Sequence, residues 1–112
     1  MADVTNVTAR VVTVFSGDMH GKTALGEDVF TWSREFTAKS IERPSLQRLG
    51  RAAAVQWWEE TDQSGDCDVM VEFTSRTGQA LGQVRARVGV TLSVDVIERR
   101  VWNAVSQKWI VA

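Results

Sequence analysis

The 112-residue chain has one cysteine (Cys67), one histidine (His20), one proline (Pro44) and no tyrosine. A single cysteine excludes an intramolecular disulfide and a cysteine-rich metal site. One histidine cannot supply a histidine metal site or a mechanism that uses several histidines. We therefore expect no metal and no cofactor, and the residues favour a protein that is not an enzyme.

The charge balance also lacks a strong sign, with 13 lysines and arginines against 14 acidic residues and a net charge of −1. Such a chain has no long-range field that would attract nucleic acid or an anionic membrane. It contains no basic leader followed by an apolar segment, and no apolar run long enough to span a membrane. We expect one soluble domain over residues 1–112, located in the cytoplasm or in a virion.

The clearest pattern is the alternation from Val84 to Val96, in which even positions are apolar and odd positions are mostly polar or glycine. Strict alternation predicts a strand with one buried face, which we extend over residues 82–96. Residues 67–88 predict a hairpin with Thr77 and Gly78 as a two-residue loop. That register opposes Cys67 with Val88, Val69 with Ala86, Val71 with Val84, and Phe73 with Gly82, all on one face.

The clearest helix pattern covers residues 44–62. Pro44 and Ser45 provide a start signal, with the serine able to cap the helix. An apolar stripe follows at helical spacing, and Ser64-Gly65 is expected to end the helix. Gly50 would let the helix lie close against a sheet. The stripe consists of Leu46, Leu49, Ala53 and Trp57.

The remaining segments complete an α+β fold. Residues 5–15 predict a strand with Val7, Ala9, Val11, Thr13 and Phe15 on one side. Residues 29–41 fit a strand or a helix face, and their aromatic and β-branched content favours the strand. A bulge is expected at Val96-Ile97, followed by a hairpin between residues 98–102 and 108–111. The result is one helix packed on a mostly antiparallel sheet, in the order strand, strand, helix, then three or four strands.

Residues 16–23 partly match a phosphate-binding loop. Gly21-Lys22-Thr23 fits the motif, but Ser16 occupies the position of its first glycine. Nucleotide-binding folds of this type also need a parallel sheet, whereas this chain predicts antiparallel hairpins. Nucleotide binding is therefore the weakest alternative, and His20 in this loop is read as an exposed side chain.

Arg85 and Arg87 are expected on the polar face of the central strand, where arginine could contact the phosphates of a nucleic acid. Asp68, Glu72 and Asp95 share that face and neutralise it, so a nucleic-acid partner is not expected. A solvated surface or a protein interface fits these arginines better.

Five tryptophans give the strongest indication of function, because tryptophan is a favoured anchor at protein interfaces. Trp57 and Trp58 are adjacent and point about 100° apart, so only one can face the sheet fully. The leading hypothesis is a non-enzymatic protein-binding or assembly protein that forms a homo-oligomer, either inhibitor-like or a viral or phage structural subunit. Its interface candidates are Trp58, Trp102, Trp109, Arg85 and Arg87.

The alternative is a small-molecule binder or minor enzyme with a pocket between helix and sheet. Its candidate lining residues are Trp32, Phe36, Trp57 and His20. The sequence leaves open the identity of any partner or ligand and the number of copies in an oligomer.

Overall fold

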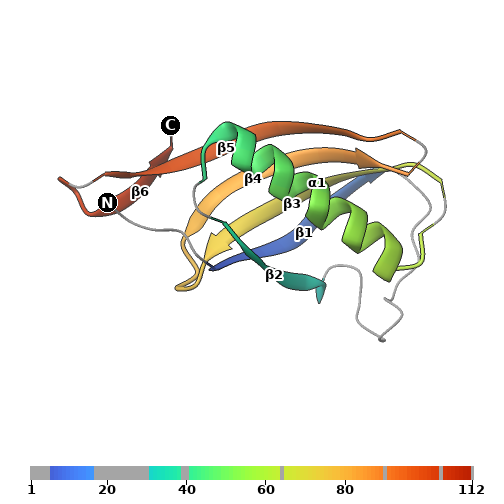
Figure 1. Cartoon of the computed structure of the whole chain (residues 1–112), viewed down its shortest axis with the longest axis horizontal. Helices are drawn as coiled ribbons and strands as arrows, with labels where there is room; N and C mark the ends of the chain where they lie inside the picture. Colours follow the sequence, from blue (N-terminus) through green and yellow to red (C-terminus); the bar gives the residue numbers. More distant parts are fainter. Residues whose placement is uncertain are drawn as a thin grey trace.

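The computed structural model describes residues 6–16, 31–38, 41–63, 65–89, 91–103 and 105–111, with backbone alone for residues 16, 101–103 and 109. In these residues, one helix lies across a six-stranded antiparallel sheet of strand order β2-β1-β3-β4-β5-β6 (Figure 1). The α+β prediction and its order of elements are confirmed. The elements are β1 (Asn6–Ser16), β2 (Ser33–Thr37), α1 (Arg43–Glu60), β3 (Cys67–Ser75), β4 (Ala80–Val88), β5 (Ser93–Asn103) and β6 (Lys108–Val111).

The core lies between α1 and one face of the sheet, because alternate residues of the central strands point towards the helix. The predicted helix stripe is buried along its length, and the sheet residues beneath it are also buried. Each fully buried aliphatic or aromatic side chain contributes roughly 1.5–3 kcal/mol. The sheet residues of this core include Val7, Ala9, Val11, Val69, Val71, Phe73, Val84, Ala86 and Val88.

Two glycines set how closely α1 approaches the sheet. A Cβ added at Gly50 would lie 2.6 Å from Cγ1 of Val84. One added at Gly82 would lie 2.8 Å from the backbone oxygen of Glu98 and 3.0 Å from Cδ1 of Leu46. Glycine at these two positions therefore permits the close packing of α1, β4 and β5. The close approach predicted for Gly50 is confirmed.

Both helix ends differ in detail from the prediction. Pro44 lies in the first turn as expected, but the N-cap residue is Glu42, without a side-chain cap, and Ser45 lies inside the helix. The helix ends at Glu60, before Ser64-Gly65. Asp62 adopts a φ of 56°, a left-handed conformation that ends helices and that aspartate tolerates better than most residues.

The β3–β4 register is the predicted one, although the predicted two-residue loop is wrong. The N–H of Ser75 donates to the carbonyl of Gln79 at 2.8 Å, which leaves a three-residue loop that ends at Gly78 with a φ of 86°. Thr74 then pairs with Ala80 while Phe73 pairs with Gly82, so the strand is bulged at Leu81. The extra loop residue and the bulge offset one another.

Residues 82–96 are two strands and not the single strand that their alternation predicted. β4 ends at Val88 and β5 begins at Ser93. Ala86 pairs with Val94, so two even-numbered residues lie opposite each other on one face. The alternation therefore continues through the turn, and periodicity cannot detect the reversal of direction.

The edges of the sheet confirm three predictions and correct one. β2 lies within the ambiguous residues 29–41, a bulge falls at Ile97, and β5 and β6 form the final hairpin. In β1, however, a register shift between Val11 and Thr13 moves Thr13 and Phe15 off the side that they were predicted to share with Val7, Ala9 and Val11, and both are exposed.

Candidate protein-binding surface

The candidate surface is the C-terminal ribbon, which we define as residues 92–111 and which contains β5 and β6. β4 pairs with β5 from Ser93 to Arg99, and β6 pairs with β5 from Arg100 to Asn103. Within the described chain, no second strand pairs with Ser93–Arg99, and Figure 1 shows β5 along the edge of the sheet. Backbone N–H and C=O groups on such an edge can pair with another chain.

The ribbon also carries most of the exposed apolar surface. Of the six large hydrophobic side chains that are exposed in the described residues, five lie in the ribbon. In contrast, no described hydrophobic side chain after Val88 is fully buried in the core. Scattered exposed apolar residues are ordinary, and their number in this ribbon makes it the candidate for an interaction surface among the described residues. The five residues are Leu92, Ile97, Val105, Ile110 and Val111.

Two of the predicted interface residues belong to this ribbon. Trp102 of β5 pairs with Trp109 of β6, so the backbone places them directly across from each other. The sequence analysis singled out these tryptophans but missed the five exposed aliphatic residues of the ribbon. The bulge predicted at Val96-Ile97 could have indicated that this part of the chain lies at an edge of the sheet, because bulges concentrate at sheet edges.

Trp58, the third tryptophan candidate, has a clear intramolecular role. Its side chain packs partly buried against the core, and its indole N–H donates to the carbonyl of Gly65 at 2.9 Å. This hydrogen bond ties the last turn of α1 to the segment that leads into β3. The contact accounts for the position of Trp58 without a partner.

Arg85 and Arg87 lie on the sheet face that α1 leaves uncovered, as predicted, with Asp68 between them. Nε and Nη2 of Arg85 donate to the two Asp68 oxygens at 3.0 and 2.8 Å, and Arg87 approaches the same carboxylate at 3.9 Å. The hydrogen bonds from Arg85, assisted by the charges of both arginines, hold the pKa of Asp68 below its usual 3.8 despite partial burial. The guanidinium of Arg85 also lies 4.1 Å from the ring centroid of Phe15. These arginines therefore have partners within the chain.

The same uncovered face contains other opposite charges in contact. Arg10 donates to Glu72 at 2.8 Å, and Arg100 donates to Glu98 at 3.1 Å. A shallow hollow of about 420 Å³ beside Asp68 is lined mainly by charged and polar groups. Such a surface is well solvated and electrically balanced, which gives it little attraction for a polyanion.

The residues proposed for a small-molecule pocket are mostly core. Trp32 and Trp57 have no exposed surface, and Phe36 packs partly buried against the core. Both indoles are therefore closed to a ligand in this structure. His20 and the Gly21-Lys22-Thr23 loop lie outside the described residues, so both remain predictions.

An ion pair between Arg34 of β2 and Glu60 of α1 lies beside the buried Trp32. Nε and Nη2 of Arg34 both donate to Oε1 of Glu60, at 3.1 and 2.7 Å, and the guanidinium lies 5.2 Å from the Trp32 ring. Desolvation acts to raise the pKa of Glu60, but the hydrogen bonds from Arg34 and Gln56, together with the charge of Arg34, lower it overall. The ion pair therefore links β2 to the last turn of α1.

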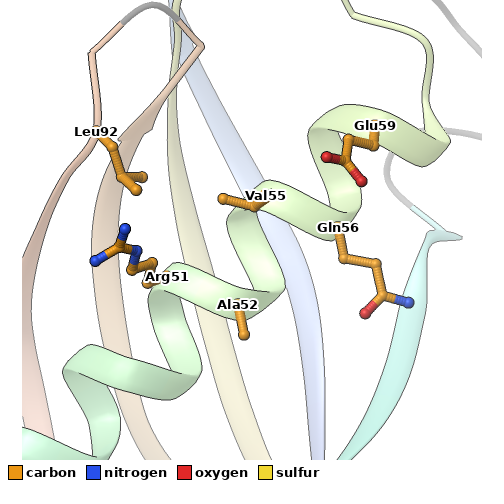
Figure 2. Close-up of a pocket in the computed structure, with 6 residues that line it drawn as sticks. All are labelled: Arg51, Ala52, Val55, Gln56, Glu59 and Leu92. Carbon is orange, nitrogen blue, oxygen red and sulfur yellow. The ribbon is translucent and has the colours of Figure 1, made fainter.

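A second hollow, of about 620 Å³, lies between the outer side of α1 and the β4–β5 turn. Figure 2 shows Leu92 pointing from the turn towards the helix, with Val55 and Arg51 on the facing side. The lining is more apolar than polar and opens to solvent. Its residues are Arg51, Ala52, Val55, Gln56, Glu59 and Leu92.

The described residues contain no cluster of three or more histidine, cysteine, aspartate or glutamate side chains able to hold a metal ion. Among the described helices, none is long and apolar enough to cross a membrane. Comparison of the chain with protein-family models, curated proteins and solved structures finds no match.

Proposed function

We propose that this protein is a non-enzymatic assembly subunit that binds copies of itself through the C-terminal ribbon. The observation that carries the proposal is the concentration of exposed apolar side chains in the C-terminal ribbon, whose segment Ser93–Arg99 pairs with β4 alone among the described residues. Strand pairing would satisfy the backbone groups, while burial of the apolar side chains would supply the driving force.

A contrast between charged and apolar exposed residues supports this choice. The charged side chains of the uncovered face pair with one another, whereas Ile97, at the border of that face and the ribbon, and Val105 and Val111 of the ribbon are each exposed by half or more. Full burial of one such side chain is worth roughly 1.5–3 kcal/mol. Association at micromolar concentrations needs about 8 kcal/mol beyond the entropy cost of association, so burial of several of these side chains and strand pairing would have to act together.

Two kinds of protein fit such a surface: an inhibitor that covers another protein's site, and a structural subunit of a virus or phage. Self-association through the ribbon favours the structural subunit, with the virion as its location. An inhibitor would use the same surface on a different protein and would remain monomeric by itself.

The test is size-exclusion chromatography with light scattering over a concentration series from 1 to 500 µM, a range on the order of the affinities expected above. We expect a mass above that of the 12.5 kDa monomer, increasing with concentration. Ile97→Gln should shift association to roughly tenfold higher concentration, because it replaces an apolar side chain that is 54% exposed.

Phe15→Gln is the matched control, because Phe15 is similarly exposed, at 46%, but lies outside the ribbon. It should leave the assembly unchanged. Circular dichroism would establish that both variants fold. A wild-type chain that stays monomeric at the highest concentration would refute the proposal.

A further inference from the structure

Building on the proposed self-association, we propose that two copies join edge to edge through β5, about a two-fold axis at Val96. The segments Ser93–Arg99 of the two copies pair antiparallel with each other, and the two sheets become one continuous sheet. Both copies use the same surface, so the contact closes at a dimer.

The outer edge of β5 has room for a strand of matching length. β6 follows β5 in the strand order and pairs with it from Arg100 onwards, so β6 bounds this edge at one end. The β4–β5 turn bounds it at the other end, before Ser93. An antiparallel copy of the segment between these limits fills it from end to end.

The backbone of Val96 is turned towards this edge. Val96 lies opposite Val84 in the β4–β5 register, but its carbonyl accepts a hydrogen bond from Nη1 of Arg43, a side chain of α1, at 3.5 Å. A residue of an antiparallel ladder points its N–H and C=O to the same side, so the N–H of Val96 faces the edge as well. Val96 is also the midpoint of the free segment. On the two-fold axis it would exchange both backbone hydrogen bonds with Val96 of the other copy, since a carbonyl oxygen can accept a second hydrogen bond beside that from Arg43.

The apolar side chains of the segment meet across this axis. Ile97 is 54% exposed, and in this register it lies diagonally across from Ile97 of the other copy, a distance of about 7–8 Å between backbones that long side chains bridge. Val96, which already packs partly buried against the core, faces its own copy directly. The β5 bulge at Ile97 falls on opposite sides of the axis in the two copies, so the register stays symmetric.

The ends of the paired segment bring further apolar residues together. Leu92 directly precedes the segment, and Val111 of β6 pairs with Arg100, just beyond its other end. Antiparallel pairing about Val96 therefore places Leu92 of one copy beside the end of β6 of the other. Both Leu92 and Val111 are exposed in the single copy, and the contact would cover them.

The acidic side chains of the segment do not oppose this pairing. Like charges directly across a strand pair are destabilising, but each carboxylate here faces a cation of its own copy. Asp95 lies opposite Arg85 of β4, and Glu98 accepts a hydrogen bond from Arg100 at 3.1 Å. A second copy of the chain thus supplies the strand length, the outward backbone groups and the apolar side chains together.

Site-directed cross-linking measures the register. Ile97→Cys treated with a short bis-maleimide should give a covalent dimer by itself. Ser93→Cys by itself should not, because its counterpart in the other copy lies roughly 20 Å away along the strand, whereas Ser93→Cys mixed with Arg99→Cys should cross-link. Cys67 is buried, so the wild-type chain is the unreactive control.

Light scattering separates this contact from other forms of self-association. The mass should level off at twice 12.5 kDa. Ile97→Lys should raise the concentration needed for association by roughly tenfold or more, because it places a charge on the paired edge. Val105→Lys is the matched control, since Val105 is exposed and apolar but lies at the hairpin tip outside the segment, and it should leave association unchanged.

Three results would overturn the two-fold pairing while leaving self-association standing: growth beyond the dimer, a Ser93–Ser93 cross-link, or association that depends on Val105 and not on Ile97. A chain that is monomeric at every concentration would overturn both proposals.

Discussion

Replacement of Gly50 by alanine tests how the helix and the sheet are held together. In an exposed helix position this change stabilises a protein by about 1 kcal/mol, because glycine has the lower helix propensity. At Gly50 the new methyl carbon would lie 2.6, 3.0 and 3.2 Å from three carbons of Val84. Contacts this short require one of the two elements to move.

The loss of stability expected for Gly50→Ala depends on how easily Val84 can move away. Val84 is fully buried in the middle of β4, and its branched side chain has few alternative rotamers. Overpacking of this kind costs about 1–3 kcal/mol. With three close contacts we expect the upper part of that range, so the gain in propensity leaves a net loss of about 1–2 kcal/mol in the free energy of unfolding.

Urea denaturation followed by tryptophan fluorescence would measure the change, since Trp32 and Trp57 are buried and become exposed on unfolding. Ala52→Gly, at an exposed position of the same helix, is the control and should cost about 1 kcal/mol. Combining Gly50→Ala with Val84→Ala should cost less than the sum of the two, by about 1 kcal/mol or more. A Gly50→Ala protein that is more stable than wild type would refute the close contact.

Three further changes test other contacts. Arg85→Gln should lower stability by up to about 1 kcal/mol at pH 7, a surface-pair value because Arg85 is half exposed. Arg85 lowers the pKa of Asp68 below 3.8, so its contribution to stability is complete above that pH and is lost as the pH falls through the lower folded-state pKa. The urea curves of the two proteins should therefore approach each other as the pH falls below 3.8, and a difference that stays constant there would contradict this origin. Trp58→Phe removes the hydrogen bond to Gly65 and should cost about 1 kcal/mol by thermal denaturation, whereas an unchanged melting temperature would show that the bond contributes nothing. Asp62→Gly should increase the free energy of unfolding by about 0.5 kcal/mol and raise the melting temperature slightly, because glycine adopts a φ of 56° without strain. A lower melting temperature would show that the aspartate side chain stabilises the helix end.

The main elements of this fold could be predicted because their apolar residues recur with the period of a strand or of a helix. The period-two alternation of residues 67–75 and 80–88 fixed the buried face and the β3–β4 register. The helical stripe from Leu46 to Trp57 placed α1 over that face, and Gly50 indicated its distance. These signals are local, so a reading of neighbouring residues captures them.

The candidate surface was only partly predictable. Trp102 and Trp109 indicated an interface from composition, and their pairing followed from the predicted final hairpin. Trp58, in contrast, has a partner in Gly65 that sequence spacing does not reveal. The exposure of Leu92 and Val105 also depends on what the rest of the chain leaves uncovered, which no local pattern encodes.

The sequence by itself determined which side chains share a face, because the periods of helix and strand are properties of the backbone. Only the tertiary structure decided where the chain reverses and which faces are covered. The turn at Gly89 continues the alternation of Val84 to Val96 unchanged, and the bulge at Leu81 offsets a longer loop, so neither leaves a mark in the pattern. The same reversals put Val105 and Leu92 at opposite ends of the molecule, and that placement depends on the whole sheet.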